Sequence, residues 1–428
     1  MPAAKRSLLL LLPLALLAPG LAWRANADAG PAPLVVHEWG TFTSMQGVDG
    51  VGLEGLQREE EALPPCVYSR AEVRDCPLRA RGYKGLETPV TGATQKMETP
   101  VIYFHTKVPL RARVRVDFVD GLLSQWYPVS DRLGPPEGQR GGAPLDVGAV
   151  GRSYLSWEVD LQPGAEPPAG LPAVAADDPW SFAREVDAAW VRTVPRVAPR
   201  AGPTETERYL FYRGLGAFGL PLVTAPGPSA GQVHTTNVGR EAVLAAFGLT
   251  VDAARTEVRW AALGPIAPGE AVTFDGQAAR ARPLAEGVAS LRAAVLEVLL
   301  AQGLFGDEAR AMVRTWTRSW FGSPGTRVLW LVPRARVDAI LPLEIDPAPA
   351  EVVRVFVGRL EVVTPAVEAE VERALLERLS GDAALRTAAD ASLAAFDRFL
   401  EPHLRAALRS TTDARVRASA EELLAGLR

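Results

Sequence analysis

The stretch Leu34–Ser44, LVVHEWGTFTS, has the pattern of a β-strand that carries a histidine, a carboxylate and two aromatic side chains. Side chains alternate between the two faces of a strand, so Val36, Glu38 and Phe42 share one face and His37 points to the other. The two apolar neighbours predict that the face of Glu38 meets the core. A carboxylate in that position needs a partner, because an unpaired buried charge is unfavourable.

Histidine and carboxylate side chains in strand-like segments suggest a metal site. His37 and Glu38 are adjacent, and His105 lies in a second strand candidate, Glu98–Lys107. Imidazole and carboxylate groups suit zinc, iron or copper. We therefore consider His37, Glu38 and His105 as ligands of a divalent transition metal, with a hydrogen-bonded structural histidine on each strand as the alternative. Since alternation separates His37 from Glu38, a shared ion also requires a bulge or bend near Gly40.

The residues before this strand have the organisation of a secretion signal. Two basic residues precede the apolar run Leu8–Leu17, and Ala25–Asn26–Ala27 fits an A-x-A cleavage site. We predict that residues 1–27 are a signal peptide, cleaved near Ala27, and that the protein is secreted or periplasmic. No later stretch approaches the run of about 18 apolar residues that a membrane span needs, so we expect no transmembrane segment in the mature chain.

Composition limits the classes of partner. The chain has 428 residues, 48% of them hydrophobic and 22% charged, which is typical of a globular protein with two or three domains. Three of its 46 Lys and Arg residues lie within residues 1–27, so the mature chain has 43 against 50 Asp and Glu, a net charge of about −7. This balance argues against nucleic acid or an anionic membrane surface as partner. An envelope or extracellular ligand is the expected partner, and the sequence leaves the oligomeric state open.

The chain has two cysteines, Cys66 and Cys76. They lie ten positions apart in a predicted loop, and disulfides are common outside the cytoplasm. We therefore predict a Cys66–Cys76 disulfide, which stabilises the fold by roughly 2–3 kcal/mol in the chain-entropy description. A reactive thiol is the alternative, but the neighbouring sequence offers no histidine or helix N-terminus to activate it.

The first two thirds of the chain are strand-like and rich in Pro and Gly. Arg111–Phe118, RARVRVDF, alternates strictly, and the short connector VPL separates it from Glu98–Lys107. This arrangement predicts an antiparallel hairpin. Short strands with turn residues between them favour an antiparallel sandwich. Residues 28–282 are therefore predicted to be a β-rich domain.

Near residue 283 the periodicity becomes helical. Apolar residues repeat at helical spacing through Leu284–Leu299, and Asp307 offers an N-cap for a second helix. The runs Val328–Val332 and Val352–Val363 are almost continuously apolar, as expected of strands covered on both faces. Residues 283–364 are therefore predicted to be a helix–helix–strand–strand part in which the helices pack on the strands.

The end of the chain is predicted to be helical. Thr364–Pro365 provides an N-cap followed by proline at the first helical position. Breaks at Gly381, Pro402 and Ser410–Thr412 indicate four short helices, so residues 365–428 form a C-terminal helical cap. The predicted fold class is α+β: an antiparallel β-sandwich-like N-terminal part, a smaller α/β part and this cap.

Two glycine motifs are interpreted as turns. Gly214–Gly219 matches G-x-G-x-x-G, but Pro221 prevents the helix that a dinucleotide site requires. Gly227–Gly231 matches G-x-S-x-G and is followed by His234, but it lacks the strand before and the helix after that a nucleophile elbow needs.

Several longer blocks support a family resemblance. The blocks are HEWGTFTS, KMETPVIYFH, ERYLFYRGLG, EARAMVRTWTRSWF and VVRVFVGRLEVVTP. Together they resemble a family of uncharacterised secreted bacterial proteins that carry these blocks in this order, and the similarity covers most of residues 35–365. The resemblance implies secretion and a single architecture, and it brings no activity and no catalytic residues.

Two functions follow from these observations. The first is a secreted or periplasmic protein with a binding or cell-envelope-associated role, in which the β-rich domain presents loops to its ligand. The alternative is a metal-dependent enzyme that uses His37, Glu38 and His105. The sequence assigns no catalytic residue to either function.

Overall fold

A computed structural model describes residues 32–58, 63–70, 90–134, 145–164, 166–194, 204–317 and 319–427. The fold is α+β, with a large mixed sheet and helices at the C-terminus, which confirms the predicted fold class at this level. The predicted signal peptide and Cys76 lie outside the described residues. None of the helices in the described ranges has the length and apolar character needed to span a membrane.

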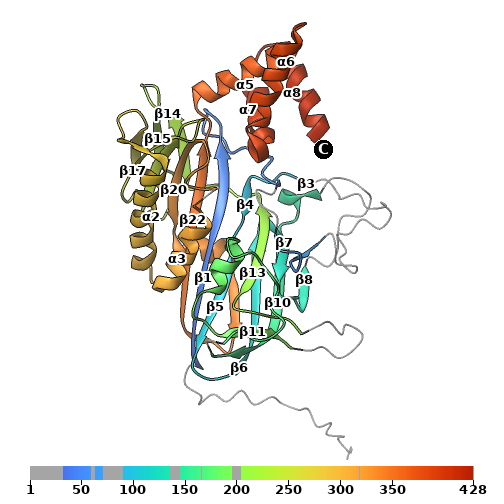
Figure 1. Ribbon diagram of the computed structural model, residues 1–428, viewed down its shortest axis with the longest axis vertical. Coiled ribbons are helices and arrows are strands. Elements are labelled where there is room, and N and C mark those ends of the chain that lie inside the picture. The colour runs from blue at the N-terminus through green and yellow to red at the C-terminus, as the bar shows by residue number, and fades with distance from the viewer. Residues whose placement is uncertain are drawn as a thin grey trace, which may run out of the picture.

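Strand β1 (Ala32–Gln46) contains the stretch around which the sheet is built (Figure 1). It pairs in parallel with β22 (Pro349–Val362), and antiparallel with β4 (Gln95–Met97) and β5 (Val101–Thr106). β1 is therefore an interior strand, and its backbone is hydrogen-bonded on both sides.

The large sheet has 11 strands and crosses the predicted boundary at residue 283. Strands from both sides of that boundary alternate within it, so residues 28–282 and 283–364 share one sheet. Its order is β19 (Ala281–Pro283), β17 (Glu257–Ala262), β16 (Ala246–Val251), β20 (Gly325–Val332), β22, β1, β4, β13 (Leu210–Gly216), β7 (Gly121–Tyr127) and β2 (Tyr68–Ser69), with β5 beside β1 and β13.

A second sheet packs on one face of the first. Apolar side chains of both sheets, such as Ile102 and Trp157, form one core with the apolar side of β1 that carries Val36 and Phe42. The second sheet has the order β12 (Thr206–Glu207), β11 (Trp190–Thr193), β10 (Arg152–Gln162), β6 (Leu110–Val119) and β21 (Leu343–Asp346), with β8 (Arg132–Gly134) beside β10.

The predicted hairpin of Glu98–Lys107 with Arg111–Phe118 is wrong. β5 lies in the large sheet, whereas β6 lies in the second sheet between β10 and β21. The short connector therefore carries the chain from one layer to the other. The alternation of apolar residues in β6 shows that one face of this strand is buried. It does not show which strand pairs with β6.

The smaller strands form two further sheets. β14 (Leu222–Pro226), β15 (Gln232–Asn237) and β18 (Ala271–Asp275) form one, and β3 (Val90–Thr91) and β9 (Leu145–Asp146) form the other. The G-x-S-x-G match falls in the turn between β14 and β15, as expected of a glycine-rich turn.

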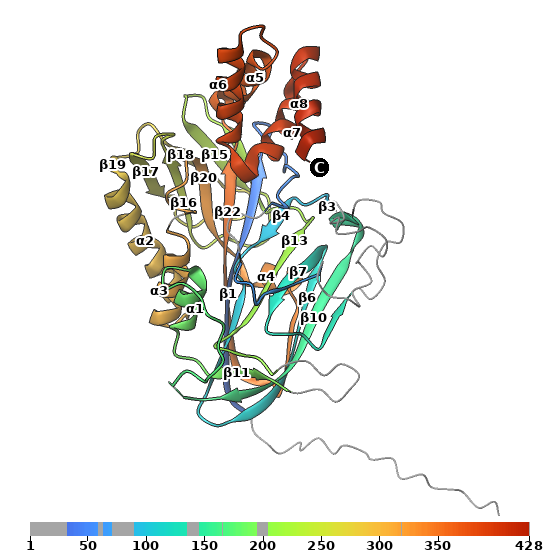
Figure 2. The same cartoon turned by 45° about the vertical axis from the view of Figure 1, so that its right-hand side comes forward.

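Helices cover the opposite face of the large sheet. α2 (Leu284–Ala301), α3 (Gly306–Thr315) and the shorter α1 (Pro179–Arg184) lie on one side of β1, and β6 and β10 lie on the other (Figure 2). Leu329 and Leu331 of β20 face these helices, and the alternate residues of β20 join the core on the opposite face of the sheet. This arrangement confirms that the helices after residue 283 pack on strands covered on both faces. The short helix α4 (Arg334–Ile340) packs on the side of the second sheet.

The C-terminal helices form a bundle at one end of β1 and β22 (Figure 1). Thr364 caps the first helix, since its hydroxyl accepts a hydrogen bond from the amide of Val367 at 3.4 Å. The described residues after it form four α-helices, as predicted, with an apolar core of their own. The predicted break at Pro402 is wrong, because the helix Leu400–Ser410 runs through this residue. The elements are α5 (Pro365–Glu377), α6 (Ala383–Ala394), the 3-10 turn η2 (Asp397–Phe399), α7 (Leu400–Ser410) and α8 (Ala414–Leu427).

A buried histidine makes this bundle sensitive to acid. His403 of α7 packs on Phe396 with ring centroids 4.2 Å apart, and its Nδ1 has no hydrogen-bond partner among the described residues. Burial lowers the pKa of His403 to about 4, although Glu361 opposes this shift. The unfolded chain has the ordinary value near 6.5. Between these two values only the unfolded state binds the proton, so stability falls as the pH falls through that window.

We therefore expect the wild type to lose roughly 2 kcal/mol more of its free energy of unfolding between pH 7 and pH 5 than His403→Leu does, because the variant has no imidazole to protonate. Urea unfolding of the full chain at both pH values, followed by far-UV circular dichroism, measures this difference. The partly exposed His234, which lies outside the bundle, provides the control, and His234→Gln should keep the wild-type pH dependence. Equal losses in wild type and His403→Leu would contradict this explanation.

Candidate metal centre

The pairing of β1 with β5 brings His37 and His105 together. Val35 is paired with His105 and His37 with Tyr103, so the two histidines are diagonal neighbours on the same face of the sheet. Their ring centroids are 5.0 Å apart, which is close enough for both to reach one ion. This face is the one that α1, α2 and α3 cover.

Glu308, in the first turn of α3, completes the cluster. Its Oε2 lies 2.7 Å from Nδ1 of His37, and its Oε1 lies 3.0 Å from Nε2 of His105. Burial acts to raise the pKa of Glu308, but the hydrogen bonds from the two imidazoles outweigh it and hold that pKa below its ordinary value. The carboxylate is therefore ionised at neutral pH, so both histidines donate to it.

Glu308 also has a structural role at the start of α3. Its Oε2 accepts a hydrogen bond from the amide of Phe305 at 2.8 Å, which is one half of a capping box. The same contact fixes the orientation of the carboxylate towards the histidines. The helix terminus and the cluster therefore depend on the same side chain.

The structure places Glu38 away from this cluster. The register of β1 with β22 is unbroken past Gly40, so strict alternation holds and Glu38 points to the opposite face from His37. The required bulge is absent from this pairing, and the carboxylate beside the two histidines is Glu308 instead. Glu38 contacts the guanidinium of Arg354, its direct neighbour on β22, and accepts a hydrogen bond from the hydroxyl of Tyr212.

Arg354 neutralises Glu38 within the core. Burial acts to lower the pKa of Arg354, but Glu38 outweighs it and keeps that pKa above its ordinary value. Burial and the neighbouring Glu38 raise the pKa of Tyr212 well above its ordinary value, so its hydroxyl remains a donor. Arg354 also donates to Asp338 at 2.8 Å. This network is the partner that the sequence requires for a carboxylate on an apolar face.

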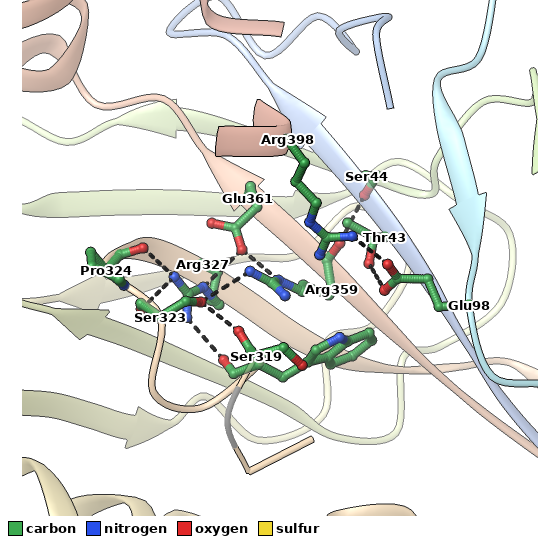
Figure 3. A network of polar contacts seen from close by, with 11 residues as sticks. Thr43, Ser44, Glu98, Ser319, Ser323, Pro324, Arg327, Arg359, Glu361 and Arg398 are labelled. Carbon is green, nitrogen blue, oxygen red and sulfur yellow. Dashed lines mark hydrogen bonds and ion pairs between the residues drawn. The ribbon is translucent and has the colours of Figure 1, made fainter. Parts of the chain in front are cut away.

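A second polar cluster joins the large sheet to the C-terminal bundle (Figure 3). Nε of Arg359 and Nε of Arg327 lie 2.5 and 2.9 Å from the carboxylate of Glu361. Burial acts to raise the pKa of Glu361, but these two cations lower it below its ordinary value. Arg398 of η2 contacts Glu98, which precedes β5. Guanidinium groups keep their protons and are not metal ligands, so this cluster braces the fold.

The cluster of His37, His105 and Glu308 can hold a metal ion. One ligand atom from each residue lies within 4.8 Å of the others. Two atoms that bind one tetrahedral ion at about 2.1 Å lie roughly 3.4 Å apart. The two histidine–carboxylate contacts, at 2.7 and 3.0 Å, therefore have to lengthen, and wider separations within the 4.8 Å limit have to shorten, when an ion binds. An ion bound by these atoms takes the place of the two imidazole protons. Two imidazoles and one carboxylate are a donor set found at zinc and non-haem iron sites.

Phe305 covers the solvent side of the cluster. Its ring centroid lies 4.4 Å from that of His37 and 4.8 Å from that of His105. The side chain of His37 is 2% exposed and that of His105 is 15% exposed, while Phe305 is 46% exposed. The aromatic ring therefore lies between the histidines and the solvent.

Phe305 also occupies the N-cap of α3, which the sequence assigned to Asp307. That prediction is wrong, because the helix begins at Gly306 and Asp307 lies in its first turn. Asp307 instead accepts a hydrogen bond from the amide of Asp187 at 2.8 Å. A polar N-cap contributes about 1 kcal/mol to a helix, and Phe305 provides no such side-chain bond.

The sequence analysis missed Glu308 because its partners are far away in the chain. It lies 271 residues from His37 and 203 residues from His105. The available signal was an acidic residue at the third position of a helix, which is typical of a capping box. That signal places Glu308 at a helix start, but it does not place that helix over β1 and β5.

Cys66, the cysteine within the described residues, provides no further site. Cys66 is half-buried, and burial raises the pKa of its thiol to about 11, which disfavours the reactive thiolate. The Cys66–Cys76 disulfide stays a prediction, because Cys76 lies outside the described residues.

Comparison with known proteins gives no family. No family model matches the chain, and no curated protein matches it. A solved structure, the yeast delta-COP-I mu-homology domain complexed with the Dsl1 WxWxV peptide, is similar at 6% identity and a TM-score of 0.26 over 78% of this chain and 98% of that one. A likeness at this level carries no argument about fold or function.

We expect Glu38→Gln to destabilise the protein by about 3 kcal/mol, because it leaves the guanidinium of Arg354 buried without its counter-charge. Its metal content should stay at the wild-type level. Urea unfolding and metal analysis of the same preparation measure both properties. Asp338→Asn, which changes the half-exposed partner of Arg354, should cost less than about 1 kcal/mol. A stable Glu38→Gln protein that lacks metal would place Glu38 in the site after all.

Proposed function

We propose that the protein works outside the cytoplasm as a metal-dependent binding protein of the cell envelope or extracellular space. In this proposal His37, His105 and Glu308 hold a divalent transition metal, and the metal or the surface around it takes part in binding the ligand. The predicted signal peptide and the absence of a basic excess support the location and the class of ligand.

One observation carries the metal assignment. Every other buried carboxylate in the described part of the chain is paired with arginine; these carboxylates are Glu38, Glu98, Asp117, Glu207, Glu361 and Glu401. Glu308 is instead met by two imidazoles that come from separate strands. A guanidinium has no lone pair for a metal and satisfies a buried carboxylate permanently, whereas an imidazole nitrogen can bind a metal ion through its lone pair. The choice of histidine here supports a metal site over a structural ion pair.

A metal-dependent enzyme is the second candidate. Three protein ligands leave a coordination position open, as in catalytic zinc sites. His105 and Phe305 are partly exposed, so the open position is close to solvent. An ion in such a site activates a bound water or polarises a substrate oxygen. Turnover of ester, peptide or phosphoester substrates that stops on chelation and returns with metal would favour this candidate over binding alone.

We expect the purified mature protein to hold about one equivalent of a divalent transition metal. His37→Ala, His105→Ala and Glu308→Gln should each remove stoichiometric binding, because each deletes a ligand. Elemental analysis by mass spectrometry, with circular dichroism to confirm folding, provides the measurement.

His234→Ala is the matched control for these variants. His234 is a partly exposed histidine in β15 whose Nδ1 lies 2.7 Å from Oγ1 of Thr273, and it lies outside the cluster. It should bind metal as the wild type does. A folded wild type that takes up no zinc, iron, copper, manganese or cobalt after reconstitution would refute the proposal.

Export and disulfide formation can be tested in one measurement. The intact mass of the protein from its native envelope or medium should correspond to a chain that begins after Ala27 and is two hydrogens lighter than the reduced form. The lost hydrogens come from the predicted Cys66–Cys76 bridge. A mass that includes Met1 would refute export with cleavage, and a fully reduced mass would refute the bridge.

A further inference from the structure

We infer that Phe305 is a gate that controls exchange of the metal at the His37–His105–Glu308 cluster. Its ring closes the solvent side of the site, so an ion enters or leaves only when that side chain rotates away. This inference rests on the proposed metal site and adds the regulation of that site.

The contacts of the ring support a covering role. The face of the cluster away from solvent is closed by the sheet itself, since His37 and His105 extend from β1 and β5. The remaining side is covered by Phe305, whose ring contacts both imidazoles at 4.4 and 4.8 Å between centroids. A ring this close to both histidines restricts the path by which water or a chelator reaches the position between them.

The choice of residue at position 305 is anomalous in two respects. Serine, threonine, aspartate and asparagine are preferred at a helix N-cap, and phenylalanine cannot accept the hydrogen bond that this position offers. A large aromatic side chain is also usually more buried than Phe305, which is 46% exposed. Residues that break local rules are found at functional sites. Unlike a preferred N-cap residue, Phe305 provides aromatic contacts with the two histidines.

The backbone around Phe305 is fixed, so the gate is the side chain alone. The amide of Phe305 donates to Glu308, and the preceding Leu304 is buried in the core beneath α2 and α3. Exposed aromatic side chains change rotamer on the picosecond to nanosecond scale when nothing holds them. Here the two imidazoles hold the ring, and breaking those contacts is the barrier to exchange.

The test is the rate of metal exchange in the full mature chain. Each protein is loaded with zinc, and release to the chromophoric chelator 4-(2-pyridylazo)resorcinol is followed by stopped flow. Phe305→Ser removes the ring and introduces a preferred N-cap residue, so it opens the gate without weakening the helix start. We expect release to be about tenfold faster, as the loss of two ring contacts predicts. Phe305→Leu, which keeps an apolar cover, should stay much closer to the wild type.

Leu300→Ser is the matched control, because Leu300 is a similarly exposed apolar residue of α2, at 43%, and is not part of the His37–His105–Glu308 cluster. It should release zinc at the wild-type rate. A gate speeds both entry and exit, so zinc association should also be faster in Phe305→Ser while the affinity changes little.

Three results would overturn the gate. They are an unchanged release rate in Phe305→Ser, an increase of the same size in Leu300→Ser, or faster release without faster association, which would make Phe305 a contributor to affinity instead. In each case zinc still binds, and the proposed function stands. A wild type that binds no metal removes the proposed function and the gate together.

Discussion

The parallel pairing of β1 with β22 is the constraint on which the rest of the structure depends. It joins a strand at the start of the described chain to one about 315 residues later, and the register is continuous from Val35 to Gln46. β1 is covered by helices on one face and by the second sheet on the other. Each polar side chain of this strand is therefore buried, and each requires a partner from another part of the fold.

Three polar side chains of β1 connect this strand to segments that are distant in the sequence. Glu38 is neutralised by β22, Thr43 donates to Glu98 at 2.8 Å, and His37 donates to Glu308 of α3. Glu98 in turn contacts Arg398, which links the strand to the C-terminal bundle. One strand rich in buried polar groups thus connects neighbouring parts of the large sheet, a covering helix and the C-terminal bundle.

The sequence predicted which side chains of β1 share a face, but it did not predict which elements lie beside this strand. The period of two separated His37 from Glu38 correctly, and an acidic residue beside Val36 and Phe42 indicated a buried cation that proved to be Arg354. Periodicity reports which face is buried, but it does not report which strand lies alongside. For this reason the hairpin was wrong. Glu308 escaped prediction for the same reason, because only the packing of α3 over β1 and β5 brings it to the histidines.

The two faces of β1 show why one buried carboxylate suits a site and another does not. Glu38 lies in the core between two sheets and contacts the guanidinium of Arg354, which stays protonated and cannot bind a metal. Glu308 lies where a helix begins, next to imidazoles whose exposure rises from His37 to His105. An imidazole can carry its proton on either ring nitrogen, so the nitrogen that faces Glu308 can bind an ion through its lone pair while the other nitrogen holds the proton. The partly exposed His105 and the two imidazoles that can bind a metal therefore lie at the same point of the sheet. Among the described residues, the core on the other face has neither an exposed edge nor a metal-binding partner for Glu38.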